Sequence, residues 1–276
     1  MKGYRLLVFT DLDGTLLDHD TYSFEPARPA LRALEERGVP LILCTSKTKA
    51  ETDRWRRALG NSHPFIVENG GGVFIPRGYF PFAAAEGADD LPYEELEFGT
   101  PYQELRRVLA DMRRRIDPSI RGFGDMTDEE VARLCGFSAE EARLAKEREY
   151  DEPFVVGDDS LLEAVEAAAG QAGLRIVKGG RFAHLLGTND KGRAVAALRG
   201  LYEKVCGPLR AVGLGDSLND LPMLQAVDIP VVVGKPGGGY DPGIDLPGLV
   251  RAQGAGPEGW REAVLGILAR ERAPVP

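Results

Sequence analysis

The sequence has few cysteines and no long hydrophobic run, and both absences narrow what the protein can be. Its 276 residues include only 3 cysteines, which are far apart and form no metal-binding spacing: Cys44, Cys135 and Cys206. We therefore predict free thiols and a reducing compartment. The longest apolar stretches, such as 39–44 and 229–233, have the length of strands and are too short to cross a bilayer. Because the N-terminal sequence lacks the pattern of a signal peptide, we predict a cytoplasmic protein with no membrane partner.

The sequence also contains fewer positively charged than negatively charged residues. The 34 Lys and Arg residues are outnumbered by 43 Asp and Glu residues, which gives a net charge of −9. This balance argues against nucleic acid as a partner. It also means that an anionic substrate is repelled by the molecule as a whole, so a phosphate site needs a metal ion and a few Lys or Arg side chains close by. No feature of the sequence predicts an oligomeric state.

Strand and helix patterns alternate at both ends of the chain. The first third contains strand-like stretches at 5–10, 39–44, 65–67 and 73–75, with helical patterns at 26–37 and 46–59. The alternation resumes near the C-terminal end, with helical patterns at 191–205 and 258–270 and strands at 211–214 and 229–233. Strand–helix–strand units of this length predict a parallel sheet with right-handed crossovers.

The middle of the chain has a different pattern. Pro, Gly and acidic residues interrupt the alternation at 79–100, and Thr127 and Ser138 begin capping boxes of short helices. Further patterns predict helices at 102–116 and 159–172 and strands at 120–123, 154–156, 174–178 and 182–186. We predict an α/β fold: a Rossmann-like doubly wound parallel sheet formed by residues 1–81 and 187–276, with an inserted α+β cap domain at 82–186.

Two carboxylates follow the first predicted strand directly, in Asp11-Leu12-Asp13-Gly14-Thr15. In open α/β sheets, ligands bind outside the carboxyl ends of the strands. Two aspartates beside a glycine that lets the backbone approach a ligand are typical of a phosphoryl-transfer site that uses Mg²⁺. A turn rich in solvated acids is the structural alternative, and this motif alone does not decide between them.

Other predicted strand ends and one helix start add polar residues at the same edge of the sheet. They are Thr45 and Ser46 after the second strand, Lys191 at the start of a helix, and Asp216, Asn219 and Asp220 after a later strand. Each has an ordinary structural alternative. Thr45 can cap the following helix, Lys191 can be a solvated lysine, and Asn219 can be a turn residue.

The order of these motifs resembles the haloacid dehalogenase superfamily of phosphohydrolases, whose larger caps are inserted between the second and third motifs. The resemblance implies that Asp11 is the nucleophile that forms an aspartyl-phosphate and that Asp13 is the general acid/base. It implies a Mg²⁺ ion held by Asp11, Asp216 and the backbone carbonyl of Asp13, with Asp220 behind them. It also implies that Thr45 and Lys191 bind the phosphate oxygens.

Further segments look like the mannosyl-3-phosphoglycerate phosphatases within this superfamily: 22–30, 43–48, 64–70, 148–154 and 179–184. This likeness implies Mg²⁺-dependent hydrolysis of mannosyl-3-phosphoglycerate to mannosylglycerate and phosphate. Glucosyl-3-phosphoglycerate, sucrose phosphate and other sugar phosphates are the alternative substrates.

Such a substrate has a carboxylate and a sugar to be recognised besides its phosphate. We predict Lys47, Lys178 and Arg181 as candidates for the carboxylate, because Lys and especially Arg suit that group. Candidates for the sugar hydroxyls and other contacts are Ser46, Glu68, Asn69, Thr188, Asn189 and Asn219. His19 and His63 are predicted on the surface, whereas His184 can face either the site or the core.

A receiver-type signalling module is the alternative from another functional class, because it also combines an Asp pair, Mg²⁺, Ser/Thr and Lys on a doubly wound sheet. In that module the phosphorylated Asp comes two strands after the acidic pair, whereas Asp216 follows a whole inserted domain. A dehalogenase is disfavoured, because halide is a good leaving group and needs no acid such as Asp13.

Overall fold

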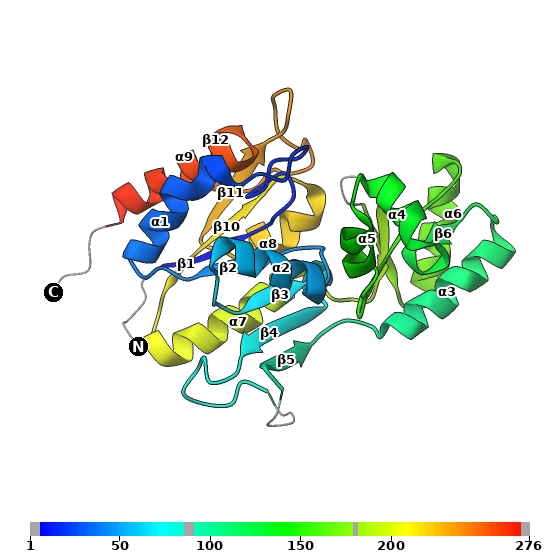
Figure 1. The fold of residues 1–276 in the computed structure, drawn as a ribbon, viewed down its shortest axis with the longest axis horizontal. Coiled ribbons are helices and arrows are strands. Elements are labelled where there is room, and N and C mark those ends of the chain that lie inside the picture. The colour runs from blue at the N-terminus through cyan, green and yellow to red at the C-terminus, as the bar shows by residue number, and fades with distance from the viewer. Residues whose placement is uncertain (1–5, 86–90, 179–181, 272–276) are drawn as a thin grey trace.

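A sheet of eight strands forms the centre of the larger domain in the computed structural model, which describes residues 6–85, 91–178 and 182–271 (Figure 1). The strand order is β12-β11-β10-β1-β2-β3-β4-β5. The strands are β1 Leu6–Thr10, β2 Leu41–Cys44, β3 Phe65–Val67, β4 Gly72–Pro76, β5 Tyr93–Glu97, β10 Arg210–Gly215, β11 Ile229–Gly234 and β12 Val250–Ala255. Neighbours from β12 to β3 are parallel, whereas β4 and β5 are antiparallel additions.

Helices cover both faces of this sheet, and β1 shows why. Its residues are all buried and alternate between the two faces. Leu6 and Val8 pack in the core cluster with α1 (Arg28–Glu36) and α9 (Gly256–Arg270), whereas Leu7 and Phe9 pack in the cluster with α7 (Lys191–Cys206) and α8 (Leu221–Gln225). A parallel strand that is buried on both faces is a continuous apolar run. The predicted doubly wound core is confirmed.

The smaller, inserted domain has a sheet of its own, ordered β6-β7-β9-β8 and antiparallel throughout. Its strands are β6 Arg121–Gly122, β7 Asp151–Val155, β8 Arg175–Lys178 and β9 Ala183–Leu186, and its helices are α3 Tyr102–Arg115, α4 Asp128–Cys135, α5 Ala139–Ala145 and α6 Leu162–Gln171. Phe154 and Leu185 point to the face that α3 and α6 cover. Their neighbours Pro153 and His184 are therefore on the opposite face, toward the core domain.

The predicted start of the inserted domain at residue 82 is wrong in one respect. Tyr93–Glu97 pairs along its whole length with β4, so β5 is an edge strand of the core sheet. The sequence pattern did not predict this strand, because an edge strand can contain acidic residues and lacks the continuous apolar run of a buried strand. Helix α2 (Lys49–Leu59) also begins later than predicted: Thr48, not Ser46, caps it in a capping box with Glu51. The pattern at 250–255 did not predict β12.

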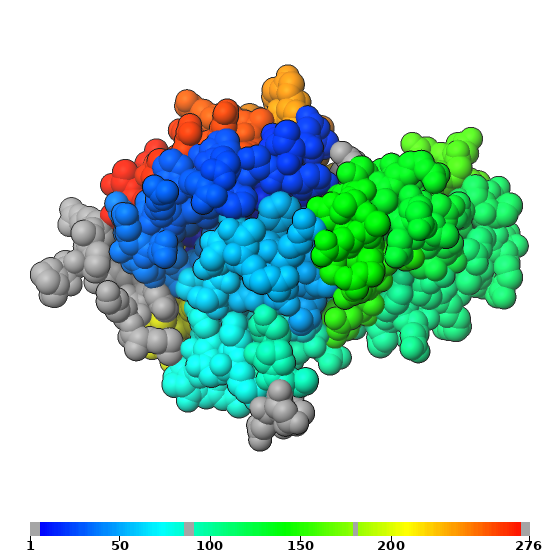
Figure 2. Space-filling model, in the orientation of Figure 1, coloured from blue at the N-terminus to red at the C-terminus, as the bar shows by residue number. Residues whose placement is uncertain are grey.

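The inserted domain lies directly against the core beside α2, as Figure 2 shows on one face of the molecule. Thr48 Oγ1 donates a hydrogen bond of 2.9 Å to the carbonyl of Leu144, and Arg54 forms an ion pair of 3.2 Å with Glu141. The three cysteines are free thiols, as predicted. Among the described residues, no helix has the length and apolar character needed to cross a bilayer.

Candidate active site

The predicted motifs meet at the carboxyl edge of the core sheet. Asp11 follows β1, Asp216 follows β10, and Lys191 is the first residue of α7. Lys191 Nζ lies 2.7 Å from Asp11 Oδ1 and 2.6 Å from Asp220 Oδ1, and its side chain is fully buried. Although burial opposes its charge, Asp11 and Asp220 raise the pKa of Lys191 above its ordinary value. The lysine is therefore a fixed cation between two carboxylates rather than a solvated residue.

A cluster of three carboxylates lies beside this lysine. Asp11, Asp216 and Asp220 each offer an oxygen, and these oxygens lie within 4.8 Å of one another. Burial, followed by the charge of Asp220, raises the pKa of Asp11 well above its usual range and that of Asp216 to about 7. The cluster is therefore short of positive charge, and carboxylate oxygens are the donors that Mg²⁺ prefers. These residues fit a divalent cation.

Gly14 allows the two acidic loops to come together. Its φ is +75°, and a Cβ at this position would lie 2.9 Å from Asp216 Oδ2. The backbone conformation favours glycine, and a larger side chain would also have to displace the carboxylate of Asp216. Thr15 adds a long hydrogen bond of 3.4 Å to Asp216 Oδ1. The geometry of the site thus favours the glycine after the acidic pair.

Asp13 lies in a different environment from Asp11. Its side chain is 41% exposed, and Oδ2 forms an ion pair of 2.9 Å with Lys47 Nζ. Asp13 Oδ1 is buried without a hydrogen-bond partner among the described residues. Lys47 has a buried side chain whose ammonium also lies over the ring of Tyr22, 5.2 Å from its centroid. One carboxylate oxygen of Asp13 is therefore held in place by a buried cation.

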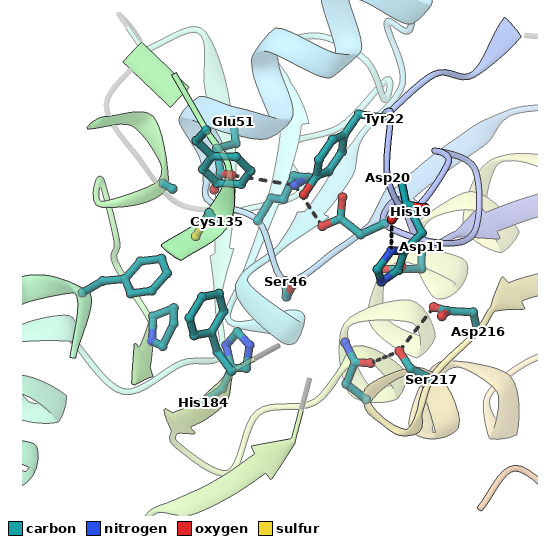
Figure 3. A pocket seen from close by; sticks show the side chains of 18 of the residues that line it. Asp11, His19, Asp20, Tyr22, Ser46, Glu51, Cys135, His184, Asp216 and Ser217 are labelled. Carbon is teal, nitrogen blue, oxygen red and sulfur yellow. Dashed lines mark hydrogen bonds and ion pairs between the residues drawn. The ribbon is translucent and has the colours of Figure 1, made fainter. Parts of the chain in front are cut away.

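A cavity of about 480 Å³ extends from these residues to the inserted domain (Figure 3). Asp11, Asp13 and Asp216 line it on the core side, whereas Phe123, Phe182 and His184 belong to the side formed by the inserted domain. Ser46, Lys47 and Asn219, which the sequence predicted as contacts, also line this cavity. His184 thus faces the site and not the core. Phosphate chemistry at one end and recognition of the leaving group at the other are both possible in one space.

Arg148 is a cavity residue to which the sequence analysis gave no role. Its side chain is 5% exposed and donates hydrogen bonds of 2.8 Å to the carbonyls of Ser46 and Ala145. A carboxylate oxygen of Glu51 lies 3.9 Å from Arg148 Nη2, and the other lies 3.9 Å from Lys47 Nζ. Arg148 and Lys47 therefore form a buried pair of cations at the cavity wall. Arg148 belongs to the segment 148–154, whose likeness to the mannosyl-3-phosphoglycerate phosphatases was the available signal.

Several predicted contacts do not line the cavity. Glu68 and Asn189 are fully buried at the junction of the domains, where Glu68 accepts hydrogen bonds from the amides of Glu149 and Tyr150. Asn69 is buried there as well. Lys178 and Thr188, which were also predicted to contact the substrate, are exposed and do not line the cavity. Arg181 lies outside the described residues. The residues after β3 and β9 thus hold the inserted domain in place.

Comparison with known proteins identifies the family. A model of haloacid dehalogenase-like hydrolases matches residues 8–79. A glucosyl-3-phosphoglycerate/mannosyl-3-phosphoglycerate phosphatase of Methanococcoides burtonii is 47% identical over 96% of this chain and 97% of its own length. The chain is a haloacid dehalogenase-like phosphatase. The mannosyl-3-phosphoglycerate phosphatase of Pyrococcus horikoshii is 34% identical to this phosphatase over 83% of this chain and 90% of its own.

Solved structures support the fold of the phosphatase. A Thermoplasma acidophilum protein has a TM-score of 0.70 at 21% identity and covers 96% of this chain and 99% of its own. The sucrose-phosphatase of Synechocystis has a TM-score of 0.61 at 13% identity, and the match covers 95% of this chain and 98% of its own. The predicted family, fold class and phosphoric monoester hydrolase activity are confirmed, and the receiver alternative is wrong.

Proposed function

We propose that this phosphatase hydrolyses mannosyl-3-phosphoglycerate, and with it glucosyl-3-phosphoglycerate, to the glycosylglycerate and phosphate. The observation on which the reaction rests is Lys191, which lies between Asp11 and Asp220 beside a cluster of three carboxylates. The substrate class rests on the relatives that bear these names and on the buried pair Lys47 and Arg148.

Neutralising charge is the first requirement of this reaction, because a carboxylate must attack a phosphate dianion. Asp11, Asp216 and the backbone carbonyl of Asp13 would hold Mg²⁺, with Asp220 behind them. When bound, Mg²⁺ neutralises part of the phosphate charge and aligns the phosphoryl group with the nucleophile. Lys191 adds a fixed positive charge that binds the phosphate oxygens, and Thr45 would bind them from the end of β2.

Asp11 and Asp13 divide the covalent steps between them. A carboxylate oxygen of Asp11 attacks phosphorus, the bond to the leaving oxygen breaks, and an aspartyl-phosphate forms. Asp13 gives its proton to the leaving oxygen and then removes a proton from the water that opens the intermediate. Lys47 holds Asp13 through the 2.9 Å ion pair, so the proton passes through a group of fixed orientation. Free phosphate and regenerated Asp11 result.

The carboxylate of the leaving group gives the buried cations Lys47 and Arg148 a proposed role in binding. In a 3-phosphoglycerate the carboxylate is two bonds further along the carbon chain from the carbon that bears the leaving oxygen, which Asp13 protonates. Lys47 contacts Asp13 and shares Glu51 with Arg148, so both cations are close to the position where this carboxylate would lie. The guanidinium fork of Arg148 suits a planar carboxylate. Ser46 and Asn219 line the same cavity and are proposed as further contacts.

A panel of substrates tests this proposal. Released phosphate should show efficient turnover of mannosyl- and glucosyl-3-phosphoglycerate, with weak discrimination between them, because they share the carboxylate and differ at one hydroxyl. Turnover should stop in EDTA and return with Mg²⁺. Equal kcat/KM values for mannose 6-phosphate or sucrose 6-phosphate would contradict the substrate class, and full activity in EDTA would contradict the metal.

Replacing Arg148 by Gln tests the carboxylate site separately. A hydrogen bond to a charged group contributes about 1.5–3 kcal/mol, so we expect kcat/KM for mannosyl-3-phosphoglycerate to fall roughly 10- to 150-fold. Hydrolysis of p-nitrophenyl phosphate, which has no carboxylate, should change little. Lys178→Met is the control, because this exposed cation lies outside the cavity. An equal loss with both substrates would show that Arg148 only stabilises the fold.

A further inference from the structure

A row of four hydrogen-bonded polar side chains crosses from the inserted domain to the core. The mechanism above uses neither His184 nor Asp151, the two members of the row that belong to the inserted domain. His184 Nδ1 lies 2.9 Å from Asp151 Oδ1, and Asn69 Nδ2 donates to Asp151 Oδ2 at 2.7 Å. Asn219 Nδ2 in turn donates to Asn69 Oδ1 at 3.3 Å. His184 and Asp151 belong to the inserted domain, whereas Asn69 and Asn219 belong to the core. The row connects a cavity side chain of one domain to the acidic loop of the other.

Asp151 fixes the orientation of the His184 ring. Its side chain is fully buried, and burial alone would raise its pKa. His184, Arg148 and the amide of Asn69 outweigh burial and hold the pKa of Asp151 below its usual range. Because an ionised carboxylate only accepts hydrogen bonds, Nδ1 of His184 is the donor. The other ring nitrogen, Nε2, has no hydrogen-bond partner among the residues that the structure describes.

His184 lies on the face of the sheet that lines the cavity. It pairs in register with Pro153, which lines the cavity too, whereas the next residues, Phe154 and Leu185, pack under the helices. Figure 3 shows the ring on the side of the inserted domain, with Asp11 and Asp216 on the core side. Its neighbours at the cavity include Phe123 and Phe182, whose rings are 5.0 Å apart. A polar ring nitrogen among apolar rings suits a group with hydroxyls on a hydrocarbon frame.

We propose that Nε2 of His184 forms a hydrogen bond with a hydroxyl of the glycosyl group, and that Asp151 positions the ring for it. This inference rests on the proposed function. The anionic parts of the substrate have their cations elsewhere, at Lys191, Lys47 and Arg148. With Nδ1 bound to Asp151, only Nε2 is left to face the cavity, and a sugar hydroxyl can either donate a hydrogen bond to this nitrogen or accept one from it. The contact therefore selects glycosylated substrates.

The test compares mannosyl-3-phosphoglycerate with 3-phosphoglycerate, which has the same phosphate and carboxylate and no sugar. We expect His184→Phe to lower kcat/KM for mannosyl-3-phosphoglycerate roughly 5- to 150-fold, since a buried hydroxyl loses its hydrogen-bond partner. The value for 3-phosphoglycerate should change little. His184→Gln keeps a hydrogen-bonding side chain and should restore part of the loss. This variant also provides the measurement if His184→Phe does not fold.

Asp151→Asn tests the positioning role. It should lower the ratio of kcat/KM for mannosyl-3-phosphoglycerate to kcat/KM for 3-phosphoglycerate. In the double variant with His184→Phe it should cause no further decrease of this ratio, because Asp151 acts through the ring. The matched control is Glu166→Gln, the same change at an exposed carboxylate of α6. Damage to the fold alone lowers kcat/KM for both substrates by the same factor and leaves their ratio unchanged.

The outcomes separate this inference from the proposed function. If the wild-type enzyme does not prefer the glycosylated substrate, the proposed function fails and this inference with it. If the wild-type enzyme has that preference and His184→Phe and His184→Gln keep it, only the role of His184 is overturned. Full additivity of Asp151→Asn and His184→Phe would overturn the positioning role of Asp151.

Discussion

Replacing Asp11 by Asn is expected to abolish turnover of every phosphate ester, by a factor on the order of 10⁵–10⁶ as for other covalent nucleophiles. The amide cannot form the acyl-phosphate, whereas the shape of the side chain is kept. Burial and the charge of Asp220 raise the pKa of Asp11, so a neutral residue is tolerated at this position. Lys191 keeps Asp220 as a partner at 2.6 Å. We therefore expect a folded protein whose Tm is not lowered.

Two measurements check this expectation. Phosphate release under steady-state conditions measures turnover, and acid quenching with a labelled substrate shows whether phosphate becomes bound to the protein. The wild-type protein should retain label, and Asp11→Asn should not. Substantial residual turnover in a folded Asp11→Asn sample, or label that remains in it, would assign the nucleophile to another residue.

The core of the fold and the acidic residues were predictable because their signals are local. Asp11 and Asp216 each follow an apolar run whose length is that of a strand, and strand ends in a parallel sheet share one edge. The capping boxes at Thr127 and Ser138 are formed as predicted, since the pattern contains both partners of each hydrogen bond. What a few neighbouring residues determine can be predicted from the sequence.

The cavity wall formed by the inserted domain was predicted poorly, because its residues act across long distances in sequence. Glu68 follows a strand end and was expected at the substrate, but its carboxylate binds amides some 80 positions away. Lys178 was expected there for its charge, but β8 is an edge strand and this side chain is exposed. Arg148 reaches the cavity only because carbonyls of both domains hold it. Such contacts depend on how the domains meet, which no local pattern specifies.

The contacts between the domains also connect recognition with chemistry. Lys47 is the clearest case, because it contacts Asp13, shares Glu51 with Arg148, and lies 5.8 Å from the ring centroid of Phe137 in the inserted domain. A substrate carboxylate bound at this point adds a negative charge close to the acid/base. In the proposed function, binding of the leaving group and orientation of Asp13 therefore involve the same lysine. Substrates without the carboxylate lose both effects, which explains why selectivity is expected in kcat as well as in KM.

Replacing Lys191 by Met is expected to affect stability and activity together. In EDTA, the variant leaves Asp11 and Asp220 buried without their cation, and breaking a buried ion pair in this way costs about 3–5 kcal/mol. Loss of a fixed charge at the transition state should lower kcat/KM about 10²- to 10³-fold for all phosphate substrates. The matched control is Lys204→Met, an exposed lysine of the same helix, which should change neither quantity.

A double variant separates the two effects of Lys191. Lys191→Met combined with Asp220→Asn removes one of the carboxylates left without a partner, so its free energy of unfolding in EDTA should exceed that of Lys191→Met alone. Activity should not return, because the charge that binds phosphate is still missing. Added Mg²⁺ should raise the Tm of Lys191→Met, since it supplies positive charge to the same cluster. An unchanged kcat/KM in Lys191→Met would show that this lysine does not bind the phosphate. If the double variant were less stable than Lys191→Met alone, the contacts of Lys191 with the two carboxylates would not be electrostatic in origin.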